Sequence, residues 1–179
     1  MIDLARHRLA HLLSEADAPV TFSAGRTAPT GDLHLHVGGV GPIKLPVASA
    51  QAKQLCRIGR PARYGRGELT ILDRRVRDAW EIPKSRVRID KRRFDQTLRP
   101  VLDGLGRELG LSPGRTPRAK LHSMLVYAPG QFFVEHQDSE RDDAMIASLV
   151  VSLPSSFTGG ALEVRHGGET ACSGRARPL

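Results

Sequence analysis

A series of short apolar runs, each bounded by Pro or Gly turn residues, fills the chain between residues 118 and 170. Two of the turn signals are Pro129-Gly130 and Gly159-Gly160. Short runs that are rich in β-branched residues, or that alternate apolar with polar residues, are typical of strands. Strands at such short intervals predict an all-β region with the pattern of a sandwich or jelly roll. The strands that we expect cover residues 120–127, 147–154 and 161–165, and the run 147–154 is expected to be buried.

A His and an Asp lie two residues apart, at His136 and Asp138, shortly after the first of these turns. Side chains alternate along an extended backbone, so both are expected to project from the same face. Two such ligands, with a third from elsewhere in the fold, make the 2-His-1-carboxylate arrangement that holds non-haem Fe(II). A triplet this short is common in unrelated sequences, so its neighbours decide its meaning.

The residues around the triplet keep the order and approximate spacing of the motifs of a known family. Tyr127 and Pro129-Gly130 precede the triplet, and Leu153-Pro154-Ser155 and Gly159-Gly160-x-Leu162 follow it. With these five elements in order, the stretch 120–168 resembles the Fe(II)/2-oxoglutarate-dependent dioxygenases. Within them it is most similar to the prolyl-4-hydroxylase-like branch.

The resemblance implies an enzyme that couples oxidative decarboxylation of 2-oxoglutarate, with O2, to hydroxylation of a C–H bond in an unidentified substrate. It implies Fe(II) as the metal, 2-oxoglutarate as co-substrate and ascorbate as a further cofactor. His136 and Asp138 match the family's metal ligands. Tyr127 matches a Tyr that contacts 2-oxoglutarate, and an aromatic residue with a solvated hydroxyl is an equal alternative for it.

The third metal ligand is not evident in the sequence. The family places a second His on a late strand, followed by a Lys or Arg that pairs with the distal carboxylate of 2-oxoglutarate. In this chain His166 is the one His after Asp138, and Arg175 lies nine residues further on. A compressed site that uses both is one alternative, and a strand-end His that binds no metal is the other.

The chain ends at Leu179, before the rest of the family's barrel, so it is expected to be a C-terminally truncated member. Three functions remain open on this basis: an active dioxygenase, an inactive remnant of the family, and a basic nucleic-acid-binding module. An unfinished sheet also exposes an unpaired edge, through which the chain is expected to self-associate.

Helices are expected upstream of the β region, at residues 3–14, 49–58 and 91–109. The last has an apolar stripe at helical spacing and ends at Gly110, and Ser49 is a candidate N-cap of the second. The predicted fold class is α+β: a partial double-stranded β-helix (jelly roll) preceded by an N-terminal region of helices and short strands. The predicted domains are an α/β support region, 1–115, and an incomplete dioxygenase jelly-roll core, 116–179.

The segment before the last helix also has some likeness to the family. Val76-Arg77 resembles a Val-Arg pair of this branch that begins a strand and loop near the substrate channel, and the pair leads into Trp80. A substrate-proximal role for Arg77 or Trp80 is therefore one hypothesis. The alternative is structural: an Arg that pairs with a local Asp, and a Trp that covers the core.

The charge of the chain is unevenly distributed. Residues 57–93 hold 13 Lys and Arg against 5 Asp and Glu, a net charge of +8, whereas the remainder is balanced at 14 against 14. Such a face suits an acidic partner, but its only aromatic residues are Tyr64 and Trp80, which gives base stacking little support. A solvated surface is therefore the favoured interpretation, and a nucleic-acid partner is the alternative.

No apolar run is long enough to span a bilayer, so no membrane partner is expected. Cys56 and Cys172 are far apart in sequence and fit no disulfide or metal-binding pattern. The expected location is therefore the reducing cytoplasm.

Overall fold

The structure, a computed structural model, describes residues 21–28, 34–66, 69–112, 114–115, 117–140 and 143–173. It confirms the predicted α+β class, with helices and several small antiparallel sheets, which form no barrel among these residues. The helix expected at 3–14 lies outside the described residues. The chain divides into two compact units: 1–29, 95–118 and 162–173 make unit 1, and 30–94, 119–161 and 174–179 make unit 2. The predicted division between residues 115 and 116 stays a prediction.

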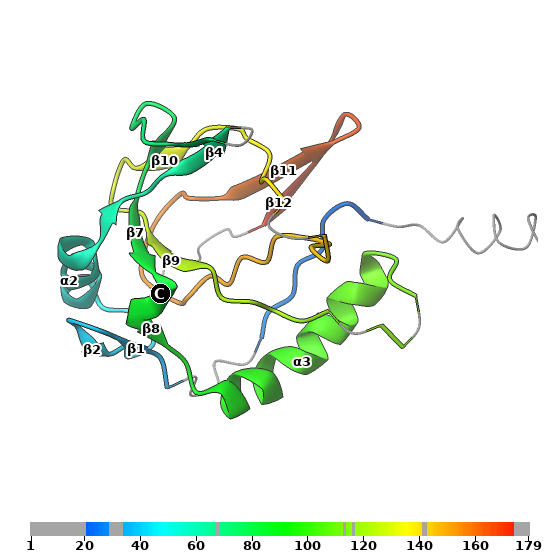
Figure 1. The fold of residues 1–179 in the computed structure, drawn as a ribbon, viewed down its shortest axis with the longest axis horizontal. Coiled ribbons are helices and arrows are strands. Elements are labelled where there is room, and N and C mark those ends of the chain that lie inside the picture. The colour runs from blue at the N-terminus through cyan, green and yellow to red at the C-terminus, as the bar shows by residue number, and fades with distance from the viewer. Residues whose placement is uncertain are drawn as a thin grey trace, which may run out of the picture. The chain divides into compact units, whose positions relative to one another are not determined.

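Most of the described strands belong to unit 2 (Figure 1). They are β1 (His36–Val37), β2 (Gly41–Pro42), β3 (Arg60–Pro61), β4 (Tyr64–Arg66), β5 (Leu69–Ile71), β6 (Arg77–Asp78), β7 (Trp80–Pro83), β8 (Val87–Arg88), β9 (Ser123–Val126) and β10 (Phe132–Phe133). The sheets that they form have the orders β2-β1-β8, β3-β7-β9, β10-β6 and β4-β5, and every pair is antiparallel. A short 3-10 turn, η1 (Lys84–Arg86), joins β7 to β8.

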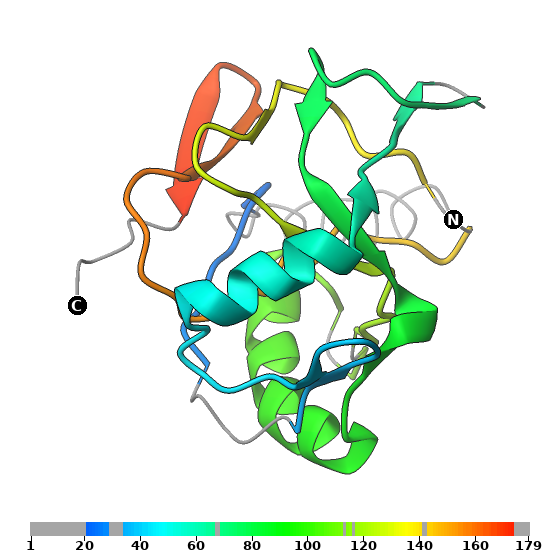
Figure 2. The same cartoon turned by 90° about the vertical axis from the view of Figure 1, so that its left-hand side faces the viewer.

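The helix α2 (Ser49–Ile58) covers one side of this unit and contacts β7 and β9; Figure 2 has it on the near side. Its bounds agree with the sequence prediction, but the predicted cap is wrong. Ala48 is the N-cap residue and forms no side-chain cap hydrogen bond, so Ser49 is already the first helical residue. Packing of Leu55 into the core therefore stabilises this helix more than a cap does.

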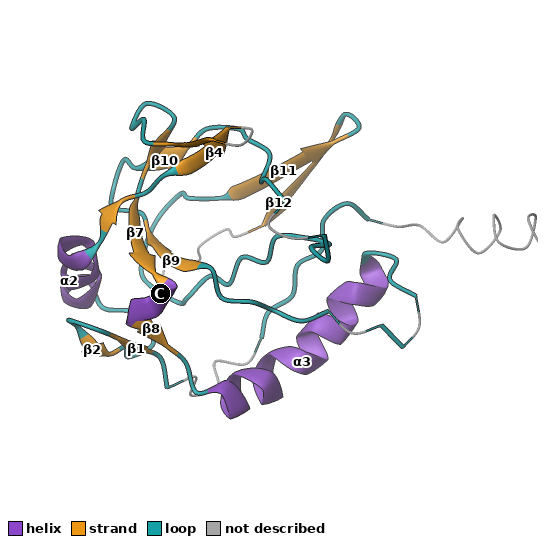
Figure 3. Ribbon diagram, viewed as in Figure 1, coloured by secondary structure: helices purple, strands orange, loops and turns teal. Residues whose placement is uncertain are grey.

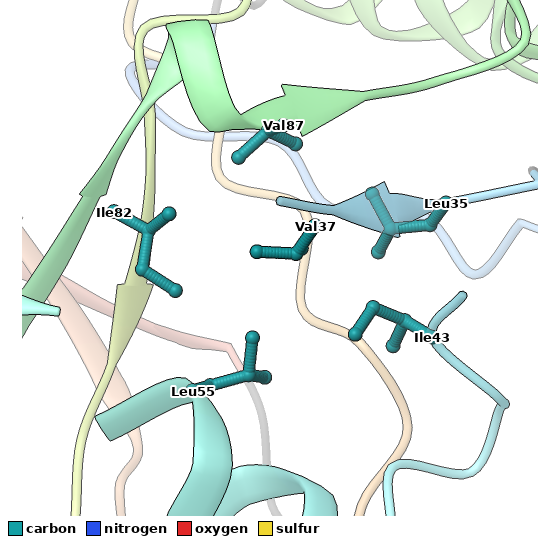
Figure 4. Packing of buried hydrophobic residues seen from close by; sticks show 6 residues of the cluster. All are labelled: Leu35, Val37, Ile43, Leu55, Ile82 and Val87. Atoms are coloured by element: carbon teal, nitrogen blue, oxygen red, sulfur yellow. The ribbon is translucent and has the colours of Figure 1, made fainter. Parts of the chain in front are cut away.

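The core of unit 2 lies between α2 and the strands. Six buried side chains form it, Leu35, Val37, Ile43, Leu55, Ile82 and Val87, and they converge from β1, α2, β7, β8 and the adjoining loops (Figure 4). Val37 and Ile82 are completely buried. Neighbouring positions on β1 and β8, such as His36 and Arg88, are exposed, which is the alternation expected of a sheet with one wet face.

β6 and β7 follow one another within residues 77–83; β7 is the central strand of the sheet β3-β7-β9, and β6 pairs with β10 in a separate two-stranded sheet. Arg60 and Pro61 of β3 pair along one side of β7. β9 and β10 pair along this stretch in the same antiparallel sense, β9 with β7 and β10 with β6. The strand expected at 120–127 is therefore confirmed in its central part, Ser123–Val126.

The segment 147–154, expected to be a buried strand, is not one. Its residues form no strand, and Leu149, Val150 and Val151 are 43%, 64% and 46% exposed. Its chain neighbour Ser155 makes a single parallel bridge with Val47. Figure 3 shows this part of the chain, between β10 and the next strand, as loop. Apolar, β-branched composition favours a strand only where another strand pairs along it, and the run's pairing is limited to its end, where the Val47 N–H donates to the Pro154 carbonyl at 2.7 Å.

Unit 1 holds most of α3 (Lys91–Glu108) and the hairpin of β11 (Leu162–His166) and β12 (Glu169–Ser173). The helix is confirmed within one residue, and Gly110 follows it with a positive φ of 74°. The strand predicted at 161–165 is also confirmed, as Leu162–His166, and most of its side chains are exposed. None of the helices in the described part of the chain combines the length and hydrophobicity required to span a membrane.

Candidate metal centre

A tight turn sets the direction in which the chain approaches His136. Gln131 N–H donates to the Ala128 carbonyl at 3.0 Å, and Gly130 lies at φ +80°. Pro at the second position and a positive-φ Gly at the third are what a type II turn requires. The Gln131 side chain then donates to Asp78 Oδ1 at 3.2 Å, which ties the turn to β6.

The strand that follows the turn is anchored to β6. Phe132 pairs with Asp78, and Phe133 pairs with Arg77. The next residue, Val134, donates its N–H to the Val76 carbonyl at 3.0 Å. Backbone hydrogen bonds therefore hold the chain in place as far as Val134, two residues before His136.

A backbone hydrogen bond fixes the orientation and the tautomer of His136. Its Nδ1 lies 2.8 Å from the Val134 carbonyl oxygen. A carbonyl oxygen only accepts, so Nδ1 must carry the proton that is donated. In the neutral ring Nε2 then has the free lone pair. Histidines that bind metals are commonly oriented in this way, by donating the other ring N–H to a carbonyl group.

The carboxylate of Asp138 converges on that lone pair. Its Oδ1 lies 3.5 Å from His136 Nε2, while its Oδ2 accepts a hydrogen bond from the Ser148 hydroxyl at 2.5 Å. Each of the two candidate ligands thus has one polar atom held by a neighbour and a second polar atom directed at the other residue. The two side chains therefore come together, but residues 136–138 lie beyond β10 and form no strand, so their common face on a strand stays a prediction.

The arrangement suits a cation. Nε2 of the neutral ring and Oδ1 both carry lone pairs, and two acceptors that face each other need a proton or a metal ion between them. Imidazole nitrogens and carboxylate oxygens bind divalent transition metals at about 2.1 Å, so two such atoms 3.5 Å apart can share one ion. The donor set also matches two members of the 2-His-1-carboxylate triad of non-haem Fe(II) sites.

Two stacked side chains, one from β10 and one from β6, support the imidazole. The Phe133 ring lies against the His136 ring with centroids 3.4 Å apart and an interplanar angle of 18°. The Arg77 guanidinium carbon lies 4.4 Å from the Phe133 centroid. Arg77 is itself held, because it donates to the Arg63 carbonyl at 2.7 Å. Its Nε is buried and has no hydrogen-bond partner among the described residues.

The centre is open to water. The side chains of His136 and Asp138 are 35% and 54% exposed. Within the part of the chain that the structure describes, no group of three or more His, Cys, Asp or Glu side chains is arranged to hold a metal ion. Two protein ligands therefore come together here, and the third stays a prediction.

The other residues singled out in the sequence have varied positions. Tyr127 follows β9 directly and is 45% exposed, and its contact with 2-oxoglutarate stays a prediction. His166 is the last residue of β11, in unit 1, and its ring lies 5.6 Å from that of Phe22. Its role as a ligand stays a prediction. Arg175 lies outside the described residues.

The structural alternative for Arg77, a pair with a local Asp, is wrong in detail. Asp78 pairs with Arg74 at 3.2 Å, whereas Arg77 contacts Phe133 and the Arg63 carbonyl. The guanidinium of Arg74 also lies over the Trp80 ring, 5.4 Å from its centroid. Arg77 thus belongs to the support of the candidate centre, a role that the sequence did not predict.

Comparison of the chain with protein-family models, with curated proteins and with solved structures found no match. The resemblance to the dioxygenases therefore depends on the motif residues alone.

Proposed function

We propose that the chain is a dioxygenase that depends on Fe(II) and 2-oxoglutarate and hydroxylates a C–H bond, as in the prolyl-4-hydroxylase-like branch. The observation that carries the proposal is the convergence of His136 Nε2 and Asp138 Oδ1, 3.5 Å apart, with the second polar atom of each residue hydrogen-bonded elsewhere. The order of the surrounding motifs supports it further.

His136 and Asp138 would hold the metal, which when bound supplies the activation of O2 and of 2-oxoglutarate. The protein's own residues orient these ligands before the metal arrives. The Val134 carbonyl keeps the proton of His136 on Nδ1, and the Ser148 hydroxyl holds Asp138 Oδ2. Ligands that are oriented beforehand lose less conformational freedom when they bind.

The finer fold and the location belong to the same proposal. Antiparallel pairing of β9 and β10 along β6 and β7 supports a partial jelly roll, in which the Asp138 loop would lie at one end of a strand. Cys56 and Cys172 are free thiols, which supports the proposed reducing cytoplasm.

The proposal is tested by the turnover of 2-oxoglutarate. The purified chain is incubated with Fe(II), ascorbate, O2 and 2-oxoglutarate, and succinate is measured. We expect succinate from the wild type and background levels from His136→Ala and Asp138→Ala, since each removes one ligand. His122→Ala, which changes an exposed His outside the candidate centre, is the matched control and should retain turnover.

Wild-type protein that binds metal yet forms no succinate would refute the dioxygenase proposal and would favour the inactive remnant. Equal turnover in wild type and His136→Ala would show that any oxidation comes from iron bound elsewhere.

A further inference from the structure

The outer face of β1 and β8 gathers cationic and hydrogen-bond-donating side chains. His36 pairs directly with Arg88 across the two strands, and Val37 pairs with Val87. Residues that are directly opposite in an antiparallel ladder share a face. Figure 4 shows Val37 and Val87 among the core side chains, so His36 and Arg88 lie on the other face, where both are exposed.

No acidic side chain of the described residues forms an ion pair with His36, Arg86 or Arg88. Arg86 makes one long hydrogen bond, 3.4 Å, to the Ile58 carbonyl. Cross-strand pairs of opposite charge stabilise a sheet, whereas an Arg opposite a His adds no such stabilisation unless an anion binds between them. Among the described residues, no acidic side chain neutralises the positive charge of this face, so an anion can bind there.

These side chains border a shallow depression. Its lining consists of His36, Gly38, Gly39, Ser85, Arg86 and Arg88. Two of the lining residues, Gly38 and Gly39, have no side chain, and Gly38 donates its N–H to the Arg86 carbonyl of η1 at 2.8 Å. Two guanidinium groups, an imidazole and a hydroxyl around one hollow are the donors that phosphate oxygens require, since Arg matches phosphate geometry with paired N–H groups.

The depression also belongs to the part of the chain that holds its excess charge. Ser85, Arg86 and Arg88 lie within residues 57–93, whose net charge is +8 in a chain whose remainder is neutral. A positive electrostatic potential around a surface depression raises the local concentration of anions. The low aromatic content of this segment disfavours base stacking but has no bearing on binding of phosphate.

We propose that the outer face of β1 and β8 binds phosphate, either as a free phosphate compound or in the backbone of a nucleic acid. Arg86 and Arg88 hold the phosphate oxygens, and His36 and Ser85 donate from its sides. The site is independent of the candidate metal centre and of the proposed oxygenase activity.

The site is tested by NMR of the His36 ring, whose signals are assigned by their loss in His36→Gln. Inorganic phosphate is titrated into the full chain at constant pH and constant ionic strength. We expect a saturable shift of the His36 signals, and an apparent affinity at least about threefold weaker in Arg88→Gln. Arg99→Gln removes the same charge from an exposed position of α3 and should leave the affinity unchanged.

A DNA duplex then separates the two sources of phosphate. If the natural ligand is a nucleic acid backbone, the duplex displaces phosphate, and the slope of log affinity against log salt falls by about one in Arg88→Gln. If it is a free phosphate compound, phosphate binds and the duplex does not displace it. A His36 shift that is absent, or equally affected by Arg88→Gln and Arg99→Gln, overturns the proposal. Arg86→Gln should weaken phosphate binding as Arg88→Gln does, so the conclusion does not depend on the correct folding of a single variant.

Discussion

Replacing Phe133 with Leu should release the His136 ring from its stack. The Phe133 ring is the middle layer, 3.4 Å from the imidazole centroid and 4.4 Å from the Arg77 guanidinium carbon. Leu keeps most of the apolar volume but has no ring face for either neighbour. The variant therefore isolates the stacking interaction from simple burial.

The expected magnitude follows from the three ring contacts of Phe133: the His136 ring, the Arg77 guanidinium and the Tyr64 ring, whose centroid lies 6.3 Å away. An aromatic pair contributes about 0.5–1.5 kcal/mol beyond its buried area, and a partly exposed cation–π contact about 0.5–1 kcal/mol. Loss of all three should lower the free energy of unfolding by about 1.5–4 kcal/mol, measured by urea denaturation. Only the first contact holds the imidazole, so metal affinity should fall by a factor between about two and ten.

The decisive readout for Phe133→Leu needs no metal. A ring stacked on Phe133 has its proton signals shifted upfield by the ring current, and NMR of the metal-free variant should show that shift relieved at His136. Phe132→Leu is the matched control, because Phe132 is the preceding residue of β10, is 44% exposed and makes no ring contact among the described residues. Identical His136 signals in the two variants would show that the stack does not exist in solution.

Three further changes test other parts of the account. Ser148→Ala removes the hydrogen bond to Asp138 and should weaken metal binding roughly tenfold or more, measured by competition with a chelator; an unchanged affinity would remove Ser148 from the site. Ile82→Ala empties a fully buried position and should lower the free energy of unfolding by about 2–5 kcal/mol in urea, whereas a loss below about 1 kcal/mol would mean that this core is loosely packed. Hydrogen bonds from Arg75 lower the pKa of Asp73, so this carboxylate stabilises the fold above about pH 4 and loses that contribution as the pH falls further; Asp73→Asn should flatten the acid limb of stability against pH, and an unaltered limb would contradict the pair.

The helices could be predicted because their signals are local. The apolar spacing and terminal Gly110 located α3 within one residue, and the bounds of α2 were also correct. The run 147–154 could not be predicted from composition, since a strand also needs a neighbour that only the tertiary fold supplies.

For the candidate site too, the sequence could predict some features and not others. The period of two along a strand predicted that His136 and Asp138 approach each other, and they do, although the chain has left β10 and bends at Glu135 before it reaches them. Their supports were not predictable, because they come from a backbone carbonyl at Val134, from Ser148 ten residues later, and from the ring of Phe133. Phe133 lies three residues before His136, and its contact with the imidazole depends on how the chain bends after β10.

The central claim is that the imidazole and the carboxylate of the H-x-D triplet hold one metal ion together. Anaerobic titration of Fe(II) into the metal-free chain tests it most directly, with His136→Ala and Asp138→Ala beside the control His122→Ala. The account predicts one saturable site in the wild type and in the control, and a large loss of affinity in each of the other two variants. A wild type that binds no Fe(II), or that binds it no better than His136→Ala, would contradict the claim.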